Sequence, residues 1–479
     1  MSQNLKKKTR TALLWSITEK AGQQIIYFIT GIIIARLLLE RDFGLVGSLA
    51  IFTAISNILL ESGFSIALIR KQNTSYEDYN TVFLFNIAVS IILYIILFFA
   101  APLISKFLGS PEITQIARRL FLVIVIYSFS IIHTTILIKK MDFRKITIVN
   151  ITSLAISALL SIYMALKGYG VWSLVTQQIS IAALRTILLW VICKWAPNFK
   201  FSKTSFNELF GYSSNLMAGS LINTISTYFY SFILGGYFPM RRVGHYIEAN
   251  KMKNMAAVSI FNAFGSSTYS MLSNLQDNPE RLKRATRKTM STIAYVAFPV
   301  MMGLGLVAKP LIELTIGFKW LPAVSLMQVL CVSGIFFIFI SMNANLIKLS
   351  GKSEQIVKLE MTSLVLMLIF LLVAVRFGIL AALIGDAVSK AITYGIYLKT
   401  TAKIMDYTWK EQLKDIGQYA LVSLIMIILL YPFKILLDNP FRLLTTQVLL
   451  GIGFYFFANK FMGSPIQDEI VSHIIKKKD

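Results

Sequence analysis

Cysteine is nearly absent from this chain of 479 residues. The two cysteines, Cys193 and Cys331, lie in separate apolar runs far apart in the sequence. They have neither the paired spacing of a metal site nor the number needed for a disulfide framework. We therefore expect no metal and no other cofactor.

Charged residues are scarce, and acids are the scarcest. Only 15% of residues are charged and 56% are hydrophobic, whereas a soluble domain has about 25% charged residues. Lys and Arg number 47 against 23 Asp and Glu, which gives a net charge of +24. In a membrane protein, basic residues mark cytoplasmic loops and contact anionic membrane lipids. We prefer that interpretation to nucleic-acid binding.

Catalytic signatures are missing as well. The sequence contains no GxxxxGK[ST], HExxH or GxSxG motif and no cluster of acids in a long loop. This argues against ATP hydrolysis, zinc-dependent hydrolysis and serine-hydrolase chemistry. We expect the protein not to be an enzyme. A membrane-bound glycan ligase or polymerase is the alternative from another class, but it would need a large polar loop.

Long apolar runs dominate what is present. A spanning helix needs about 20 apolar residues, and the short alternating segments of a membrane barrel do not occur. We predict an all-α integral membrane protein. Its fourteen expected spans are 13–39, 43–69, 81–108, 117–138, 146–166, 171–195, 209–236, 243–272, 287–308, 321–347, 356–376, 378–400, 416–437 and 441–460.

A weak internal repeat divides these spans into two lobes. The first span is followed by a charged cluster and Phe43-Gly44-Leu45, and the span 209–236 is followed by Pro239 and the run Val243-Gly244-His245. Internal repeats are common in transporters, with the substrate site between them. The predicted divisions are a six-helix lobe at 1–195, a cytoplasmic linker at 196–208, a second six-helix lobe at 209–401, and a terminal helix pair with a basic tail at 402–479.

Basic clusters predict the orientation. The densest lie at 139–145, 281–288 and 476–478, which fall on one side of the membrane if fourteen spans alternate. Cytoplasmic loops carry the excess of Lys and Arg, so both termini should be cytoplasmic. Residues 6–10 resemble the charged start of a signal peptide, but no cleavage site follows, and we expect 13–39 to stay as the first span.

Charges within the spans are the candidate functional residues. A charge at bilayer depth costs about 2.5–3.5 kcal/mol even on lenient scales, so each needs a partner or water. Lys and Arg bind phosphate well, and Arg does so with two parallel hydrogen bonds. The candidates for a cationic cavity are Arg185, Lys251, Lys253, Lys20 and Arg36, and the candidates for coupling or ion pairing are Glu19, Glu61, His133, Asp386 and Lys390.

A structural role is the alternative for each of these residues. Asp386 and Lys390 are four residues apart on one helix and would neutralise each other. Glu19 and Lys20 lie close enough to the cytoplasmic end to extend towards water. Glu61 would pair with a neighbouring helix.

The remaining candidates differ in how far the sequence constrains them. Arg185 has no carboxylate nearby in sequence, so its partner must be a tertiary contact or a ligand. Lys251 and Lys253 cannot share one helical face tightly, so one of them should face elsewhere. For His133 we favour packing over proton coupling.

Several sequence elements, taken in their order and spacing, resemble one transporter family. The chain resembles the PST-type exporters of polysaccharide and lipopolysaccharide, Wzx-like members of the MOP flippase superfamily, which also holds the multidrug MATE transporters and the lipid II flippases. The elements that carry the resemblance are ARLLLERDFGL (35–45), ESGFSIALIRK (61–71), YNTVFLFNIAVS (79–90), KKMDFRK (139–145), GYGVWSLVTQQ (168–178), VGHYIEANKMKN (243–254), LSNLQDNPERLKR (272–284) and GFKWLPAVSLMQVLCVSG (317–334).

The resemblance implies a function. Such a protein moves an oligosaccharide on undecaprenyl pyrophosphate from the inner to the outer leaflet of a bacterial inner membrane by alternating access between two lobes. The pathway would export O-antigen, capsule or exopolysaccharide, with a polymerase and glycosyltransferases as partners. A lipid II flippase is the alternative within this class. A MATE-type drug or cation antiporter is another, although it would favour acidic residues in its cavity.

Overall fold

The computed structural model describes residues 3–61, 64–275 and 277–476, and the regular elements in these ranges are helices. The chain divides into two compact units, Met1–Gly244 and His245–Asp479. The predicted all-α class is therefore confirmed. Of the basic tail, residues 477–479 lie outside the described ranges.

The first unit holds the helices up to α10, and α11 begins in it and continues into the second unit. They are α1 (Gln3–Leu37), α2 (Glu40–Ser48), α3 (Ala50–Glu61), α4 (Phe64–Arg70), α5 (Tyr76–Phe107), α6 (Ile113–Leu120), α7 (Leu122–Lys139), α8 (Phe143–Leu166), α9 (Val171–Cys193), α10 (Lys203–Tyr237) and α11 (Met240–Ser273).

The second unit contains the remaining helices. They are α12 (Pro279–Leu306), α13 (Ala308–Thr315), the 3-10 turn η1 (Phe318–Trp320), α14 (Ala323–Leu349), α15 (Ser353–Ala374), the 3-10 turn η2 (Val375–Phe377), α16 (Ile379–Met405), α17 (Trp409–Leu430), α18 (Phe433–Leu436), α19 (Pro440–Phe461) and α20 (Pro465–Lys476).

Membrane crossing is supported for most of the predicted spans. Within the described residues, 11 helical segments are long and apolar enough to cross a bilayer, and each coincides with a predicted span. The predicted spans 13–39, 209–236 and 243–272 are the helices α1, α10 and α11, which do not meet the same test. The protein is a multi-pass membrane protein, and the total of fourteen spans stays a prediction.

The distribution of side chains fits a lipid surround. Phe99, Leu159 and Phe457 are 72%, 68% and 70% exposed on spanning helices. In contrast, Asn86 and Ser128 lie buried inside the first unit. Apolar atoms outside and polar atoms inside is the arrangement expected where the solvent around the helices is hydrocarbon.

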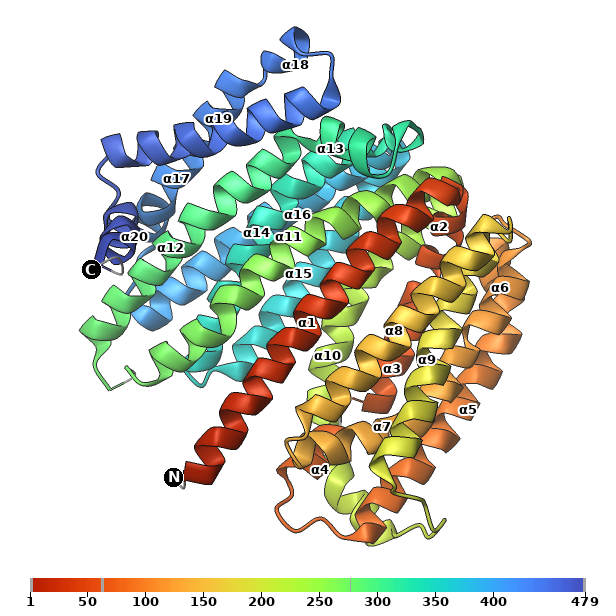
Figure 1. Cartoon of the computed structure of the whole chain (residues 1–479). Helices are drawn as coiled ribbons and strands as arrows, with labels where there is room; N and C mark the ends of the chain where they lie inside the picture. Colours follow the sequence, from red (N-terminus) through yellow and green to blue (C-terminus); the bar gives the residue numbers. More distant parts are fainter. Residues whose placement is uncertain (1–2, 62–63, 276, 477–479) are drawn as a thin grey trace. The chain divides into compact units, whose positions relative to one another are not determined.

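In the first unit, α1 lies along α8, α8 along α9, and α7 contacts both α5 and α9 (Figure 1). Helix α10 packs on α2, α3, α4 and α5. The predicted second lobe begins with α10, so the compact units and the lobes predicted from the repeat are different divisions of the chain. The lobe boundaries stay a prediction.

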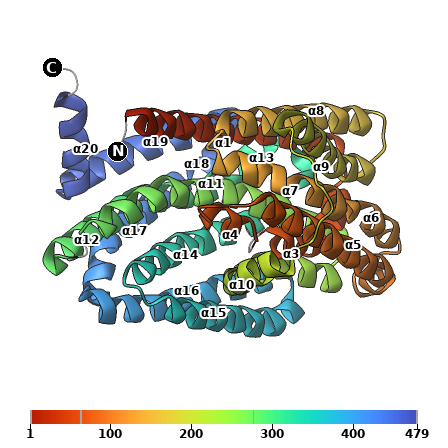
Figure 2. The ribbon, with the colours of Figure 1, turned by 90° about the horizontal axis from the view of Figure 1, so that it is seen from below.

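In the second unit, α16 contacts both α14 and α15, and α12 contacts α14 and α17 (Figure 2). Helix α19 packs on α17 and α13, which joins the terminal helices to the rest of this unit.

The repeat predicted from sequence corresponds to a contact inside the first unit. A Cβ added to Gly44 would overlap the carbonyl oxygen of Met240, and one added to Gly244 would overlap that of Glu40. The two contacts are reciprocal because each partner lies four residues before the other glycine. Only glycine lets two backbones approach this closely. The charged cluster that was expected to end the first span instead begins α2, where the Asp42 carboxylate accepts a hydrogen bond from the Leu39 N–H at 3.0 Å.

The segment after α9 is tied to the first unit by its backbone. The N–H groups of Asn198 and Ser202 donate to the side chains of Asn80 and Thr81 on α5, at 2.9 and 3.0 Å. These bonds hold residues 196–202, the first half of the predicted linker, against the beginning of α5.

A side-chain contact ties down the start of α10 in the same way. Lys71, between α4 and α5, donates to Glu208 on α10 at 2.9 Å and also to Asp78 on α5. The hydrogen bond to Glu208 raises the pKa of Lys71 above its usual value. The predicted linker is therefore fixed on the first unit at both ends.

Candidate functional site

Arg185 on α9 is the centre of a polar network among apolar helices of the first unit. Its guanidinium donates to the Tyr127 hydroxyl at 2.9 Å and to the Thr134 hydroxyl at 3.3 Å, both on α7. The guanidinium carbon also lies 4.9 Å from the centre of the Tyr127 ring. The Tyr127 hydroxyl in turn donates to the Glu61 carboxylate at the end of α3. Arg185 therefore has its hydrogen-bond partners on another helix. The Glu61 carboxylate is linked to it through the Tyr127 hydroxyl.

A second acid lies within electrostatic range of Arg185. Glu19 on α1 interacts with it electrostatically, as Glu61 does. The Glu19 carboxylate is held by hydrogen bonds from Asn150 on α8 at 2.6 Å and from Gln23 at 3.2 Å. The first unit thus surrounds one guanidinium with two carboxylates, each fixed by neutral donors. It does not form a purely cationic wall.

The other candidate cations of the first unit lie apart from each other. Lys20 and Arg36 are both exposed on α1. They are sixteen residues apart, and at a rise of 1.5 Å per residue this separates them by about 24 Å. These two side chains therefore cannot contact the same phosphate group, and only one of them can belong to a single cavity site.

Lys251 and Lys253 on α11 have different surroundings. Lys251 is partly exposed and forms an ion pair with Glu248 at 3.3 Å on the same helix. Lys253 is 6% exposed and donates to the Asn254 side chain at 2.7 Å. The direct neutralisation of Lys251 by Glu248 makes Lys253 the better candidate for a ligand contact.

Lys253 belongs to a second cluster, inside the second unit. It interacts electrostatically with Asp386 and Lys390 on α16. Lys390 and Asp386 form a direct ion pair at 2.7 Å, and Lys390 also donates to the Ser333 hydroxyl on α14 at 3.4 Å. The ion pair between Asp386 and Lys390 that the four-residue spacing predicted is therefore present. The cluster therefore brings together two lysines and one aspartate.

His133 on α7 has the environment of a packing residue. One ring nitrogen lies 3.1 Å from the Trp195 carbonyl oxygen and the other 3.2 Å from the Phe129 carbonyl oxygen. The imidazole also packs against the rings of Trp190 and Trp195. These contacts join α7 to the segment that follows α9, and they support the structural alternative for this histidine.

Several partners of the candidate residues escaped the sequence analysis. Tyr127 and Thr134 are seven residues apart on α7, which places them on one helical face. Glu248 precedes Lys251 by three residues and so lies beside it. Both spacings were visible in the sequence. Asn150 and Ser333, in contrast, carry no local signal, because their partners lie on helices far away in the chain.

Metal binding has no candidate in the described ranges. There, no three His, Cys, Asp or Glu side chains lie close enough together to hold an ion. Both cysteines are free thiols, one in each unit.

The chain is similar to proteins of polysaccharide pathways. It is 25% identical over 319 residues to the succinoglycan biosynthesis transport protein ExoT of Rhizobium meliloti, covering 67% of this chain and 65% of that one. It is 22% identical over 462 residues to an uncharacterized membrane protein of the cps region of Klebsiella pneumoniae, covering 94% of each. The lipopolysaccharide biosynthesis protein WzxC of Escherichia coli is 21% identical over 334 residues, covering 69% and 68%.

Solved structures show the same fold. The lipid II flippase MurJ, in an inward closed conformation, superposes with a TM-score of 0.75 at 16% identity, covering 94% of this chain and 98% of that one. An inward-facing multidrug MATE transporter of the MOP superfamily gives a TM-score of 0.62 at 16% identity, covering 80% and 96%. The predicted MATE-like, MOP-type architecture is confirmed.

One family model covers most of the chain. The model described as polysaccharide biosynthesis protein matches residues 33–325, which is more than half of the 479 residues. This stretch includes Arg185 with Tyr127, Thr134 and Glu61, the glycine contact and α11. The resemblance inferred from the sequence elements is confirmed, and the chain belongs to the polysaccharide biosynthesis protein family.

Proposed function

We propose that this protein flips oligosaccharide repeat units, linked to undecaprenyl pyrophosphate, from the inner to the outer leaflet of a bacterial inner membrane. The export of a cell-surface polysaccharide would depend on it. One observation carries the proposal: a member of the polysaccharide biosynthesis family has the fold of a lipid II flippase over 94% of its length. In this scheme the substrate's pyrophosphate and sugars cross within the protein, while the lipid tail stays in the bilayer.

Arg185 is the proposed ligand for the pyrophosphate. It is held by two hydroxyls, those of Tyr127 and Thr134, and not by a direct ion pair. A phosphate oxygen accepts from a guanidinium more strongly than a hydroxyl does, and two oxygens can accept at once. Substrate entry would therefore displace the hydroxyls. Glu61, bonded to Tyr127, supplies the negative charge that draws Arg185 back when the substrate leaves.

Lys253 is the proposed cationic residue of the second half. Its cluster with Asp386 and Lys390 holds two amines and one carboxylate, so protonation of both lysines gives a surplus of positive charge. A surplus charge away from water favours an anionic ligand, because the ligand replaces solvation that burial removed. Lys251, Lys20 and the coupling candidates are assigned no direct substrate contact in this proposal.

The proposed arrangement of lobes follows the repeat. Residues 1–195 and 209–401 would alternate between opening inwards and outwards, joined by the cytoplasmic linker 196–208. Residues 402–479 would form the terminal pair. Both termini are placed in the cytoplasm, since the basic clusters at 139–145 and 281–288 then face it. A polymerase would take the unit on the outer side, and glycosyltransferases would supply it on the inner side.

A deletion strain of the source bacterium tests the function. We expect lipid-linked repeat units to accumulate on the inner leaflet, with loss of the surface polysaccharide and normal peptidoglycan synthesis. Arrest of peptidoglycan synthesis would instead identify lipid II as the substrate, which the MurJ-like fold makes the second candidate. Normal polysaccharide together with hypersensitivity to cationic drugs would overturn both in favour of antiport.

A second measurement must distinguish substrate in the inner leaflet from substrate in the outer leaflet. Proteoliposomes containing the purified protein and the strain's own lipid-linked oligosaccharide allow this, because a membrane-impermeant glycosidase digests only the outward-facing sugar. We expect nearly complete digestion with the wild-type protein. Digestion of only about half the substrate, as in protein-free vesicles, would contradict flipping.

A further inference from the structure

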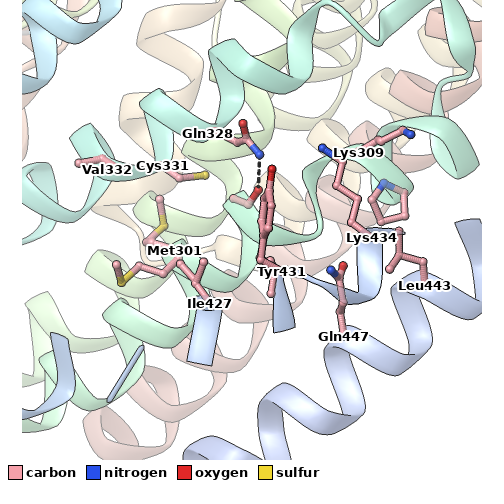
Figure 3. A pocket seen from close by; sticks show the side chains of 14 residues that line it. Met301, Lys309, Gln328, Cys331, Val332, Ile427, Tyr431, Lys434, Leu443 and Gln447 are labelled. Carbon is pink, nitrogen blue, oxygen red and sulfur yellow. Dashed lines mark hydrogen bonds between the residues drawn. The ribbon is translucent and has the colours of Figure 1, made fainter. Parts of the chain in front are cut away.

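A pocket in the second unit belongs to neither charge cluster described above. It has a volume of about 210 Å³ and lies where the terminal helices α17 to α19 meet α12, α13 and α14 (Figure 3). Most of its wall is apolar, with Met301 and Met302 from α12, Ile427 from α17 and Leu443 from α19. A wall of flexible and branched aliphatic side chains suits a hydrocarbon chain.

Two lysines give the same pocket a cationic side. Lys309 of α13 and Lys434 of α18 both line it, and Figure 3 draws them on the same side of the pocket. Lys309 is 3.8 Å from Glu313, and Lys434 lies 5.6 Å from the centre of the Tyr431 ring. Two ammonium groups and one carboxylate leave a positive balance, which favours a phosphate.

A buried amide adds a third, independent feature. Gln447 of α19 lines the pocket and is only 4% exposed. Its Nε2 donates to the Leu430 carbonyl oxygen at 3.3 Å, which fixes the orientation of the amide. Its Oε1 is buried and has no hydrogen-bond partner among the described residues. Figure 3 shows the amide pointing towards the side where Lys434 lies. A buried acceptor without a donor is costly, and a small rotation of the amide would let its oxygen accept a hydrogen bond from a ligand hydroxyl.

We propose that this pocket binds one anionic glycerophospholipid with a hydroxylated headgroup, such as phosphatidylglycerol. The phosphate lies between Lys309 and Lys434, a headgroup hydroxyl donates to Gln447, and an acyl chain follows the methionines and Ile427. The three features demand an anion, an alcohol and a hydrocarbon in one molecule. A bare polyprenyl phosphate supplies only the first and the last, whereas the proposed oligosaccharide substrate also carries hydroxyls and is the competing ligand. The inference concerns a resident lipid and does not depend on the proposed function.

The bound lipid would join the terminal helices to the rest of the unit. The pocket residues come from α12 to α14 on one side and from α17 to α19 on the other. A ligand that contacts both sides stabilises the folded state, and more so as its concentration rises above its dissociation constant. Thermal unfolding of the complete protein therefore reports on binding.

The test uses the purified, delipidated full-length chain in detergent. We expect phosphatidylglycerol to raise the unfolding temperature by several degrees, and phosphatidylethanolamine and inorganic phosphate to raise it much less. In the double variant Lys309→Gln/Lys434→Gln, binding should weaken about tenfold or more, as expected when charge-assisted hydrogen bonds are lost. The matched control is Lys410→Gln/Lys414→Gln, which removes two exposed lysines of α17 outside the pocket and should respond like the wild type.

Two further variants keep the inference falsifiable if the double variant is unstable. Val332→Phe projects a ring into the pocket from a position that is 46% exposed, so it should block binding without harming the fold. Gln447→Met should erase the preference for phosphatidylglycerol over phosphatidic acid, which has no headgroup alcohol.

An equal shift with inorganic phosphate would show an anion site and no lipid site. A larger shift with undecaprenyl phosphate, lost in the same variants, would assign the pocket to the polyprenyl lipid. No shift with phosphatidylglycerol, or a shift that survives Val332→Phe, would show that the pocket binds no lipid.

Discussion

Arg185 in the first unit and Lys390 in the second are both cations carried by apolar helices, but their partners differ. Lys390 contacts the Asp386 carboxylate directly at 2.7 Å, one helical turn away. Arg185 contacts two hydroxyls, and the Glu61 carboxylate is reached only through the Tyr127 hydroxyl. One cation is neutralised within its own helix, and the other is held by neutral groups on another helix.

The difference indicates which of the two cations can leave its partner to bind a ligand. Separating a direct ion pair away from water leaves both charges uncompensated, which costs about 3–5 kcal/mol. Releasing a guanidinium from a neutral hydroxyl costs about 1.5–3 kcal/mol, and an incoming phosphate offsets it. We therefore expect Asp386 and Lys390 to govern stability and Arg185 to govern transport.

The largest effect is expected from Asp386→Asn. The change leaves Lys390 without its carboxylate. Lys253 interacts with the same pair, so two neighbouring lysines then lack a compensating acid. Unfolding of the purified protein should become easier by about 3 kcal/mol, the low end for a broken buried pair, since Lys390 is 27% exposed. The control Asp386→Asn/Lys390→Met removes both charges and should recover most of the loss. An unchanged unfolding temperature in Asp386→Asn would show that the pair is not structural.

Arg185→Gln should lower flipping and leave stability almost unchanged. The amide can still bond to Tyr127 or Thr134, so the unfolding temperature should change little. Flipping should fall by roughly 10- to 100-fold, the value of one or two charge-assisted hydrogen bonds to phosphate. Arg185→Lys keeps the charge without the paired donors and should be intermediate. Wild-type flipping by Arg185→Gln in proteoliposomes would remove this residue from the site.

The sequence was sufficient for the all-α class and for most of the membrane spans, because hydropathy decides both. In the part of the chain that the structure describes, eleven predicted spans recur as membrane-competent helices, since length and apolar content decide that structure. For the helices α1, α10 and α11, hydropathy does not decide whether they cross the membrane. They are the first helix of each predicted lobe and the second helix of the second lobe.

The sequence repeat did not predict the backbone contact at Gly44 and Gly244. Phe43-Gly44-Leu45 and Val243-Gly244-His245 were recognised as equivalent, but nothing in either run says that the two glycines meet. Their contact depends on backbone atoms of Glu40 and Met240. Close approach of two backbones follows from tertiary packing, which single-sequence periodicity does not contain.

The candidate site shows the same limit. The charges themselves were found from the sequence, because a charge in an apolar run is conspicuous. Their partners were found only where they lie on the same helix, as with Asp386 and Lys390. The Tyr127 hydroxyl, which decides how Arg185 is held, is 58 residues away along the chain. An uncharged side chain at that distance gives no signal of pairing.

Tyr127→Phe sharpens the comparison by removing the hydroxyl between Arg185 and Glu61. The guanidinium and the carboxylate then either meet directly or both lose a partner. We expect a direct pair that resembles Lys390 and Asp386, with higher stability and a flipping rate lower by about tenfold, because the phosphate must now displace a carboxylate. The double variant Tyr127→Phe/Glu61→Gln should restore part of the rate. Faster flipping in Tyr127→Phe alone would contradict a role for the hydroxyl in releasing Arg185.

The smallest effect is expected from His133→Gln, on the same helix as Tyr127. The glutamine amide can donate to the Trp195 carbonyl oxygen, which now lies 3.1 Å from one imidazole nitrogen, and it loses the contact of the other nitrogen with the Phe129 carbonyl at 3.2 Å. Flipping should stay within about twofold of the wild type, and a modest loss of stability should follow from the missing ring contacts. A stable His133→Gln protein that flips tenfold more slowly, with a changed dependence on pH, would instead make this histidine a proton carrier. In that case charge coupling would pass along α7, and the hydroxyl that separates Arg185 from Glu61 would be one part of a longer path.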